Sequence, residues 1–108
     1  MIIDPDQFEA KADETARLLK ALANQRRLMV LCKLITLGRA TVGDLAQAVG
    51  LSQSALSQHL SVMRDEGLVT FDRDAQTLWY RIGDPRVTTL IGTLYDLYCA
   101  PGAPARQG

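Results

Sequence analysis

The sequence predicts a mainly α-helical domain with one β-hairpin inserted before its last helix. Apolar residues recur at helical spacing in five segments, and Asp, Asn, Thr or Ser stands before each segment as a helix cap. Between the fourth and fifth segments the apolar period changes to two, which is typical of β-strands. The expected order of elements is therefore α-α-α-α-β-β-α.

The first two segments predict consecutive helices. Residues 6–22 have apolar side chains at helical spacing, and either Asp4 or Asp6 can cap their start. Asn24 is the expected cap of a second helix over residues 25–37. That helix has an apolar face on which a cysteine is expected to be a small buried hydrophobe; the face comprises Leu28, Leu31, Cys32 and Ile35.

Residues 41–67, TVGDLAQAVGLSQSALSQHLSVMRDEG, predict a helix-turn-helix. Thr41 caps a short helix that ends at Gly50, and Ser52 caps a second helix that Gly67 closes. The second helix of such a motif enters the DNA major groove. A small apolar cluster is expected to hold the two helices together: Leu45, Val49, Leu51, Leu56 and Leu60.

The exposed face of the second helix is rich in short hydrogen-bonding side chains. Gln pairs with adenine through two hydrogen bonds, and Ser bonds to bases or to phosphates. Each of these residues alone is most simply a solvated side chain, but together they fill a whole helix face that a β-hairpin follows directly. The only histidine is expected to pack partly at the DNA-facing edge. The predicted DNA-contacting residues here are Ser52, Gln53, Ser54, Ser57, Gln58, His59, Ser61 and Arg64.

Two segments of period two, residues 68–73 and 77–82, predict a hairpin around the turn-forming sequence DRDAQ. In a winged helix the tip of such a hairpin reaches towards the DNA minor groove, and Arg73 is the candidate contact. Its neighbours Asp72 and Asp74 would repel phosphate. Two further side chains, Arg64 and Arg81, are expected either to contact phosphates or to form surface ion pairs.

The last helix is expected over residues 86–99, with Asp84 as its cap and Pro85 at its first position. At 100° per residue, Cys99 is rotated by about 140° from Leu94, the centre of the apolar stripe. Partial exposure at this site would suit a reactive thiol. The stripe consists of Val87, Leu90, Leu94, Leu97 and Tyr98, whereas Cys99 aligns with Thr88, Gly92 and Tyr95.

Composition limits the function further. The formal net charge is zero, but residues 1–14 sum to −4 and the remainder to +4, which permits DNA binding. No apolar run approaches the length of a membrane span, and the acidic N-terminus does not resemble a signal peptide, so a cytoplasmic protein with reduced thiols is expected. A single histidine, with no paired carboxylates and no glycine-rich phosphate loop, argues against an enzyme.

The segments LLKALANQRRLMVLCKL, DLAQAVGLSQSALSQHLSVMRDEGLV and TLWYRI resemble the ArsR/SmtB family of bacterial winged-helix repressors. The resemblance implies that residues 1–100 form a winged helix-turn-helix domain for DNA binding and dimerisation. It also implies a homodimer built by the first and last helices, a near-palindromic operator, and release of DNA when an effector is sensed. Residues 101–108 are expected to form a disordered tail.

The sequence leaves several classes of effector possible. Metal sensors of this family use cysteines at the third helix or Asp and His in the last helix, and the matching segments here have neither set. Two cysteines without histidine make a poor Zn²⁺ site, although two thiolates can hold Cu(I).

The positions of the cysteines instead resemble the BigR/SqrR/YgaV group of sulfide and redox sensors. This resemblance implies that Cys32 and Cys99 are free in the DNA-bound state and are joined by a disulfide or polysulfide bridge when reactive sulfur species appear. No cofactor is expected, and haem is a weaker candidate. Also open are a metal sensor, a repressor without an effector, and an interaction module that does not bind DNA.

Overall fold

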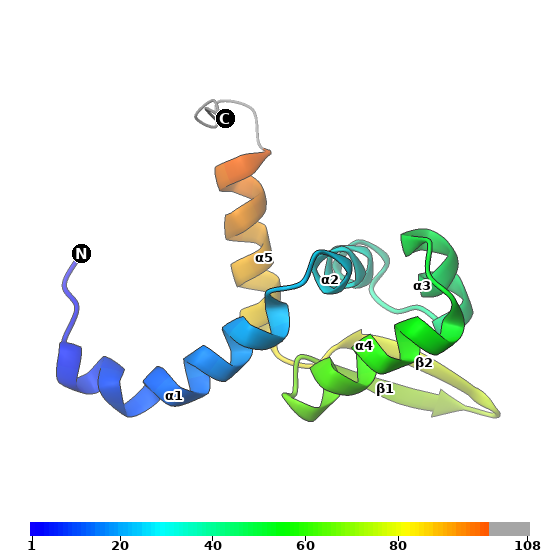
Figure 1. Cartoon of the computed structure of the whole chain (residues 1–108), viewed down its shortest axis with the longest axis horizontal. Coiled ribbons are helices and arrows are strands. Elements are labelled where there is room, and N and C mark those ends of the chain that lie inside the picture. Colours follow the sequence, from blue (N-terminus) through cyan, green and yellow to red (C-terminus); the bar gives the residue numbers. More distant parts are fainter. Residues whose placement is uncertain (100–108) are drawn as a thin grey trace.

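The computed structural model describes residues 1–99 and has the expected order of elements (Figure 1). The fold is a winged helix, as the sequence predicts. The expected tail, residues 101–108, lies outside the described residues. The elements are α1 (Pro5–Leu22), α2 (Gln25–Leu37), α3 (Val42–Val49), α4 (Gln53–Asp65), β1 (Val69–Asp74), β2 (Thr77–Ile82) and α5 (Pro85–Tyr98).

Side-chain caps fix where the helices start. The Asn24 carboxamide oxygen accepts hydrogen bonds from the backbone N–H groups of Arg26 and Arg27, at 2.9 and 3.2 Å. Asp4 is the cap of α1, which therefore starts at Pro5, one residue earlier than predicted. Proline is tolerated there because the first N–H groups of a helix have no partner within the helix. The other predicted caps, Thr41, Ser52 and Asp84, are also confirmed.

The hydrophobic core is built around α2, whose Val30, Leu31 and Leu34 have no exposed surface. The helix-turn-helix packs on it through the predicted apolar cluster, although Leu51 is only half-buried. The predicted stripe of α4 is also confirmed as buried: Leu56, Leu60 and Met63.

The turn of the hairpin is shorter than predicted, and the first strand is shifted by one residue. The last residue pair of the antiparallel ladder is Asp74–Thr77, so only Ala75 and Gln76 remain in the turn, and Arg73 lies in β1 opposite Leu78. The prediction that DRDAQ forms the turn was therefore wrong: Ala75 takes a φ of 55°, and this left-handed residue closes the chain reversal within two residues.

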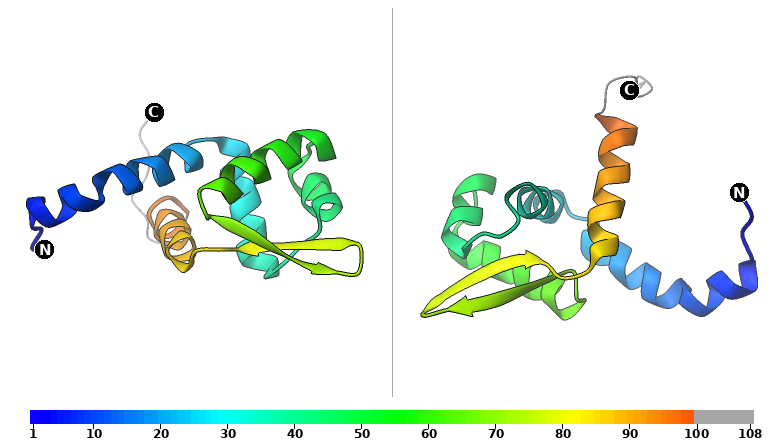
Figure 2. Two further views of the ribbon diagram at one scale, coloured as in Figure 1. Left: turned by 90° about the horizontal axis from the view of Figure 1, so that it is seen from below. Right: turned by 180° about the vertical axis from the view of Figure 1, so that it is seen from behind.

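Helices α1 and α5 project from the body on the side away from the hairpin tip (Figures 1 and 2). On α5, Val87 is buried and Leu90 packs on the core, but Leu97 and Tyr98 are each 55% exposed. The single chain thus covers only the first part of the predicted stripe. No helix within residues 1–99 is long and apolar enough to cross a membrane.

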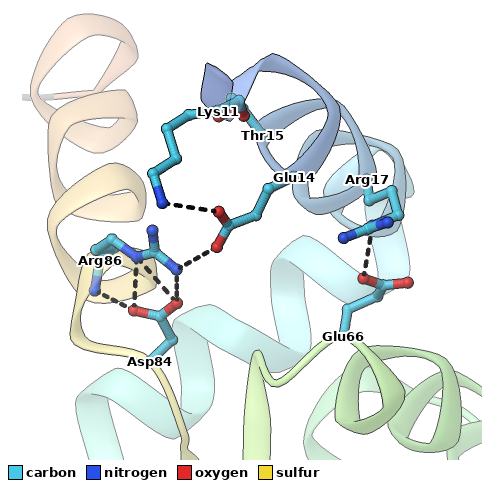
Figure 3. A network of polar contacts seen from close by, with 7 residues as sticks. All are labelled: Lys11, Glu14, Thr15, Arg17, Glu66, Asp84 and Arg86. Carbon is cyan, nitrogen blue, oxygen red and sulfur yellow. Dashed lines mark hydrogen bonds and ion pairs between the residues drawn. The ribbon is translucent and has the colours of Figure 1, made fainter. Parts of the chain in front are cut away.

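Ion pairs connect α1 to its neighbours at two points (Figure 3). Glu14 pairs with Arg86 at the start of α5 at 3.6 Å, and Arg17 pairs with Glu66 just beyond α4 at 3.9 Å. Exposed ion pairs of this kind each contribute only about 0.2–1 kcal/mol. Their effect is therefore to orient α1 more than to stabilise the fold.

The burial pattern of α4 predicts that its buried residues contribute to stability and its exposed residues do not. Leu56→Ala leaves a cavity at a site with no exposed surface, and we expect it to lower the free energy of unfolding by about 2–5 kcal/mol. The neighbouring Ser57→Ala changes an exposed residue and should change stability by less than about 0.5 kcal/mol. Urea unfolding at one fixed protein concentration measures both. Equal losses would contradict this description of α4.

Candidate DNA interface and thiol site

The polar residues of α4 that the sequence places on its outer face are exposed in the structure. Ser54, Ser57, Gln58 and Ser61 are all exposed, as are Gln53 and the cap Ser52. A Cβ atom placed on Gly43 would lie 3.5 Å from the side-chain nitrogen of Gln53, so the N-terminal ends of α3 and α4 are adjacent. This is the arrangement in which the second helix of a helix-turn-helix lies in the major groove with its N-terminal residues on the bases.

His59 is half-buried, which confirms that this side chain is partly packed. Its Nδ1 accepts a hydrogen bond of 3.1 Å from Nε of Arg27, which places the proton of the neutral ring on Nε2. Burial of the ring is the larger cause that lowers the pKa of His59 below 6.5, and the charges of Arg27 and Arg26 lower it further.

Two arginines at the start of α2 organise the helices behind this face, a role that no pattern in the sequence indicated. Arg26 donates from Nη1 to the backbone oxygen of Val49 at the end of α3, at 2.7 Å. Arg27 donates from Nη1 to the backbone oxygen of Ala21 in α1, at 3.3 Å, as well as to His59. The pair thus connects α2 to each of the other helices at this end of the domain.

The candidate cations on the hairpin differ in what they contact. The guanidinium of Arg64 lies over the ring of Phe71 at 4.4 Å, so it connects α4 to β1. Arg81 donates from Nε to Asp72 at 2.8 Å and so forms a surface ion pair. This hydrogen bond is the main cause that lowers the pKa of the Asp72 carboxyl. Arg73 is exposed two residues from the turn.

Cys32 is exposed, so the expectation that it is buried with the apolar residues of its helix was wrong. The core face of α2 is centred on Leu31 and Leu34, and a step of 100° turns Cys32 away from it. Cys32 instead lines a groove of about 480 Å³ between α2 and α5. The other lining residues are Ile35 and Thr36 of α2, and Thr88, Ile91, Gly92, Tyr95 and Asp96 of α5.

Cys99 is also exposed, as predicted, and ends α5 as its C-cap. Its backbone N–H donates to the oxygen of Tyr95 at 2.8 Å. The row on α5 with which the sequence aligns it, Thr88, Gly92 and Tyr95, is the row that lines the groove beside Cys32. Cys99 therefore extends this row by one helical turn beyond Tyr95.

Potential metal ligands do not gather at this groove or elsewhere in the described part of the chain. Within residues 1–99 no group of three or more His, Cys, Asp and Glu side chains has the arrangement of a metal site. Asp96 and Cys32 line the same groove, but they are the only side chains of these types that do so among the described residues. A structural zinc site normally requires four such ligands.

Helices α3 and α4 form a helix-turn-helix that packs on α2 and exposes a polar face of α4, and the β1–β2 hairpin follows it. Together these features define a winged helix-turn-helix DNA-binding protein. The family of bacterial regulatory proteins named arsR matches residues 24–70. The HTH-type transcriptional regulator YgaV of Escherichia coli (strain K12) is 45% identical over 93 residues, which cover 86% of this chain and 94% of the relative. The chain therefore belongs to the ArsR family and is a transcriptional regulator.

Solved structures agree with this assignment. The crystal structure of the transcriptional repressor BigR from Xylella fastidiosa has a TM-score of 0.82 at 37% identity, covering 91% of this chain and 99% of that chain. A homodimeric winged helix-turn-helix DNA-binding domain from Mycobacterium bovis, Mb0332, has a TM-score of 0.74 at 34% identity, covering 87% and 86%. Regulators of this family thus bind DNA and form homodimers.

The Arg27–His59 hydrogen bond predicts a dependence of stability on pH. Because the folded protein lowers the pKa of His59, the unfolded chain takes up a proton more readily. The contribution of His59 to stability is therefore complete above pH 6.5 and is lost as the pH falls through the pKa of the folded state. In His59→Asn, the amide oxygen replaces Nδ1 as acceptor and cannot be protonated in this range.

Urea unfolding at pH 5.0, 6.0 and 7.5 compares the two proteins. The wild type should lose more stability than His59→Asn between pH 7.5 and pH 5.0. Equal losses would show that protonation of His59 does not affect folding.

Proposed function

We propose that this protein is a dimeric repressor that releases its operator DNA when Cys32 and Cys99 become joined by a disulfide or polysulfide bridge. The observation that supports this proposal most strongly is the groove between α2 and α5. Cys32 lines it from α2, and Cys99 continues the row of α5 residues that line it from the other side. Both thiols are exposed, so reactive sulfur species in solution can reach them.

The chemistry of the bridge requires an oxidant of the polysulfide class. A thiolate of one cysteine attacks the polysulfide, breaks one S–S bond, keeps a short sulfur chain and expels the remainder as a shorter polysulfide. The second thiolate attacks the retained chain and expels hydrosulfide. The two thiols together lose two electrons, which the released sulfide carries away.

The length of the bridge provides selectivity. A direct disulfide needs Cα atoms within about 7 Å, whereas a bridge with additional sulfur atoms spans a wider gap. The groove between α2 and α5 provides space for such atoms, since its volume is about 480 Å³. Polysulfides would therefore be distinguished from oxidants that supply no sulfur.

The signal would reach the DNA through the arrangement of the dimer. We propose that α1 and α5, which project from the body and expose Leu97 and Tyr98, build the dimer interface. Two recognition helices must lie about 34 Å apart to enter successive major grooves. A bridge that fixes α5 to α2 would change this spacing and shift the population away from the DNA-binding arrangement.

Within this proposal, DNA is contacted by the exposed residues of α4, with Arg73 at the wing. The compartment that fits is the cytoplasm, where thiols stay reduced until a reactive sulfur species appears. No cofactor is needed.

Thiol substitutions test the switch. The reduced wild type should lose at least tenfold in affinity for DNA after treatment with sodium tetrasulfide, because the bridge stabilises the arrangement that does not bind. Cys32→Ser and Cys99→Ser should each keep their affinity, since neither can form the bridge. Electrophoretic mobility shift on a duplex selected by the reduced protein from a random-sequence pool measures this.

Intact-mass measurement of the same samples shows whether sulfur was added. Release of DNA from either serine variant on tetrasulfide treatment would reject the thiol switch. Release on addition of Cu(I) or haem alone would favour a metal or haem sensor. An absence of any selected duplex would favour the interaction module that does not bind DNA.

The dimer interface has its own test. Leu97→Glu places a charge on the exposed stripe of α5 and should convert the protein to a monomer in sedimentation velocity, because a charge at an apolar interface is costly to bury. Gln47→Glu adds the same charge on the exposed surface of α3 and should leave the dimer intact. A dimer of unchanged affinity in Leu97→Glu would exclude the end of α5 from the interface.

A further inference from the structure

We propose that Arg39 is a contact to the DNA backbone, held ready for a phosphate by the indole ring of Trp79. The proposal rests on DNA binding by this chain, as proposed above. Arg39 lies in the linker between α2 and α3, outside the recognition helix and outside the hairpin tip.

The guanidinium of Arg39 stacks on the ring of Trp79. Its guanidinium carbon lies 4.4 Å from the centroid of the Trp79 ring, and this cation–π contact occupies the flat face of the guanidinium. Within residues 1–99 it makes no hydrogen bond and no ion pair. The N–H groups at the edge of the plane therefore stay available, in the fork that matches two phosphate oxygens.

The linker connects Arg39 to the N-terminal end of α4 through fixed contacts. Ala40 exchanges two backbone hydrogen bonds with Tyr80 of β2, at 3.0 and 2.8 Å, which fixes the residue next to Arg39. Thr41 then caps α3, whose second residue, Gly43, lies against Gln53 at the start of α4. Arg39 is thus four residues before Gly43, which lies against Gln53, a residue predicted to contact bases.

Arg81 lies on the same face of the hairpin as Trp79, but its guanidinium, unlike that of Arg39, forms an ion pair. In the antiparallel register Trp79 and Arg81 point to one side, but the guanidinium of Arg81 is engaged by Asp72 at 2.8 Å. Asp72 also senses the charge of Arg39, which contributes to lowering its pKa after the larger effect of Arg81. Arg81 thus forms the direct ion pair with Asp72, whereas Arg39 acts on that carboxylate only through its charge and keeps its N–H groups without a hydrogen-bond partner among residues 1–99.

A phosphate contact has a defined signature in salt dependence. Each neutralised phosphate contributes about 0.9 to the slope of log K against log salt concentration. Two copies of Arg39 in a dimer should contribute roughly 1.8. Because phosphates have no sequence information, the loss should be the same on specific and unrelated DNA.

The experiment compares Arg39→Gln, Arg39→Lys and Arg81→Gln with the wild type. Fluorescence anisotropy gives Kd between 50 and 300 mM salt, about the range in which such slopes are measured, for a duplex selected by the reduced wild type and for a scrambled duplex of equal length. Arg39→Gln should lower the slope by roughly 1.8 on both duplexes. Arg39→Lys should keep the slope but bind more weakly, since lysine lacks the planar fork.

Arg81→Gln is the matched control, because it removes the same charge from the same face. It should change the slope by less than half as much as Arg39→Gln. A slope in Arg39→Gln equal to that of the wild type, or equal to that of Arg81→Gln, overturns the proposal. So does a loss confined to the selected duplex, which would indicate a base contact. If the wild type itself selects no duplex, the proposed function fails together with this inference.

Discussion

The packing of α2 is the constraint on which the other features of this domain depend. Its core face, Val30, Leu31 and Leu34, is fully buried and receives the helix-turn-helix, the hairpin and the start of α5. Its first turn supplies Arg26 and Arg27, which bond to α3, α1 and α4. Because one rigid helix has all these contacts, the orientation of the recognition helix is set by its position relative to α2.

The same helix also bears one of the two thiols, one residue after Leu31 and facing α5. A bridge from Cys32 to Cys99 would therefore act on α2, against which α4 is oriented. At its other end it would act on α5, which is proposed to form the dimer interface. Protein interiors are close-packed and do not deform gradually, so a new bond at the groove is expected to move α5 as a body. The ion pairs from Glu14 to Arg86 and from Arg17 to Glu66 would take α1 along with it.

The element order, the caps and the core of the helix-turn-helix could be predicted because each depends on local spacing. Thr41, Ser52 and Asp84 bond within their own first turns, so the sequence alone reveals them. The exposure of Cys32 could not be predicted, since a helical face of α2 does not show where α5 will pack. Contacts between distant residues, such as Arg27 with His59 and Arg39 with Trp79, left no pattern in the sequence. The turn was misplaced because Asp74 favours turns but here ends a strand.

The most direct test of the account is to determine which two cysteines one bridge joins. Light protein and ¹⁵N-labelled protein are mixed, allowed to exchange subunits, treated with tetrasulfide and digested with trypsin without reduction. Cys32 is released in residues 28–33 and Cys99 in residues 87–106. A groove within one chain predicts bridged peptide pairs that are wholly light or wholly heavy. Pairs of one light and one heavy peptide, in the proportion of the mixed dimers, would contradict it.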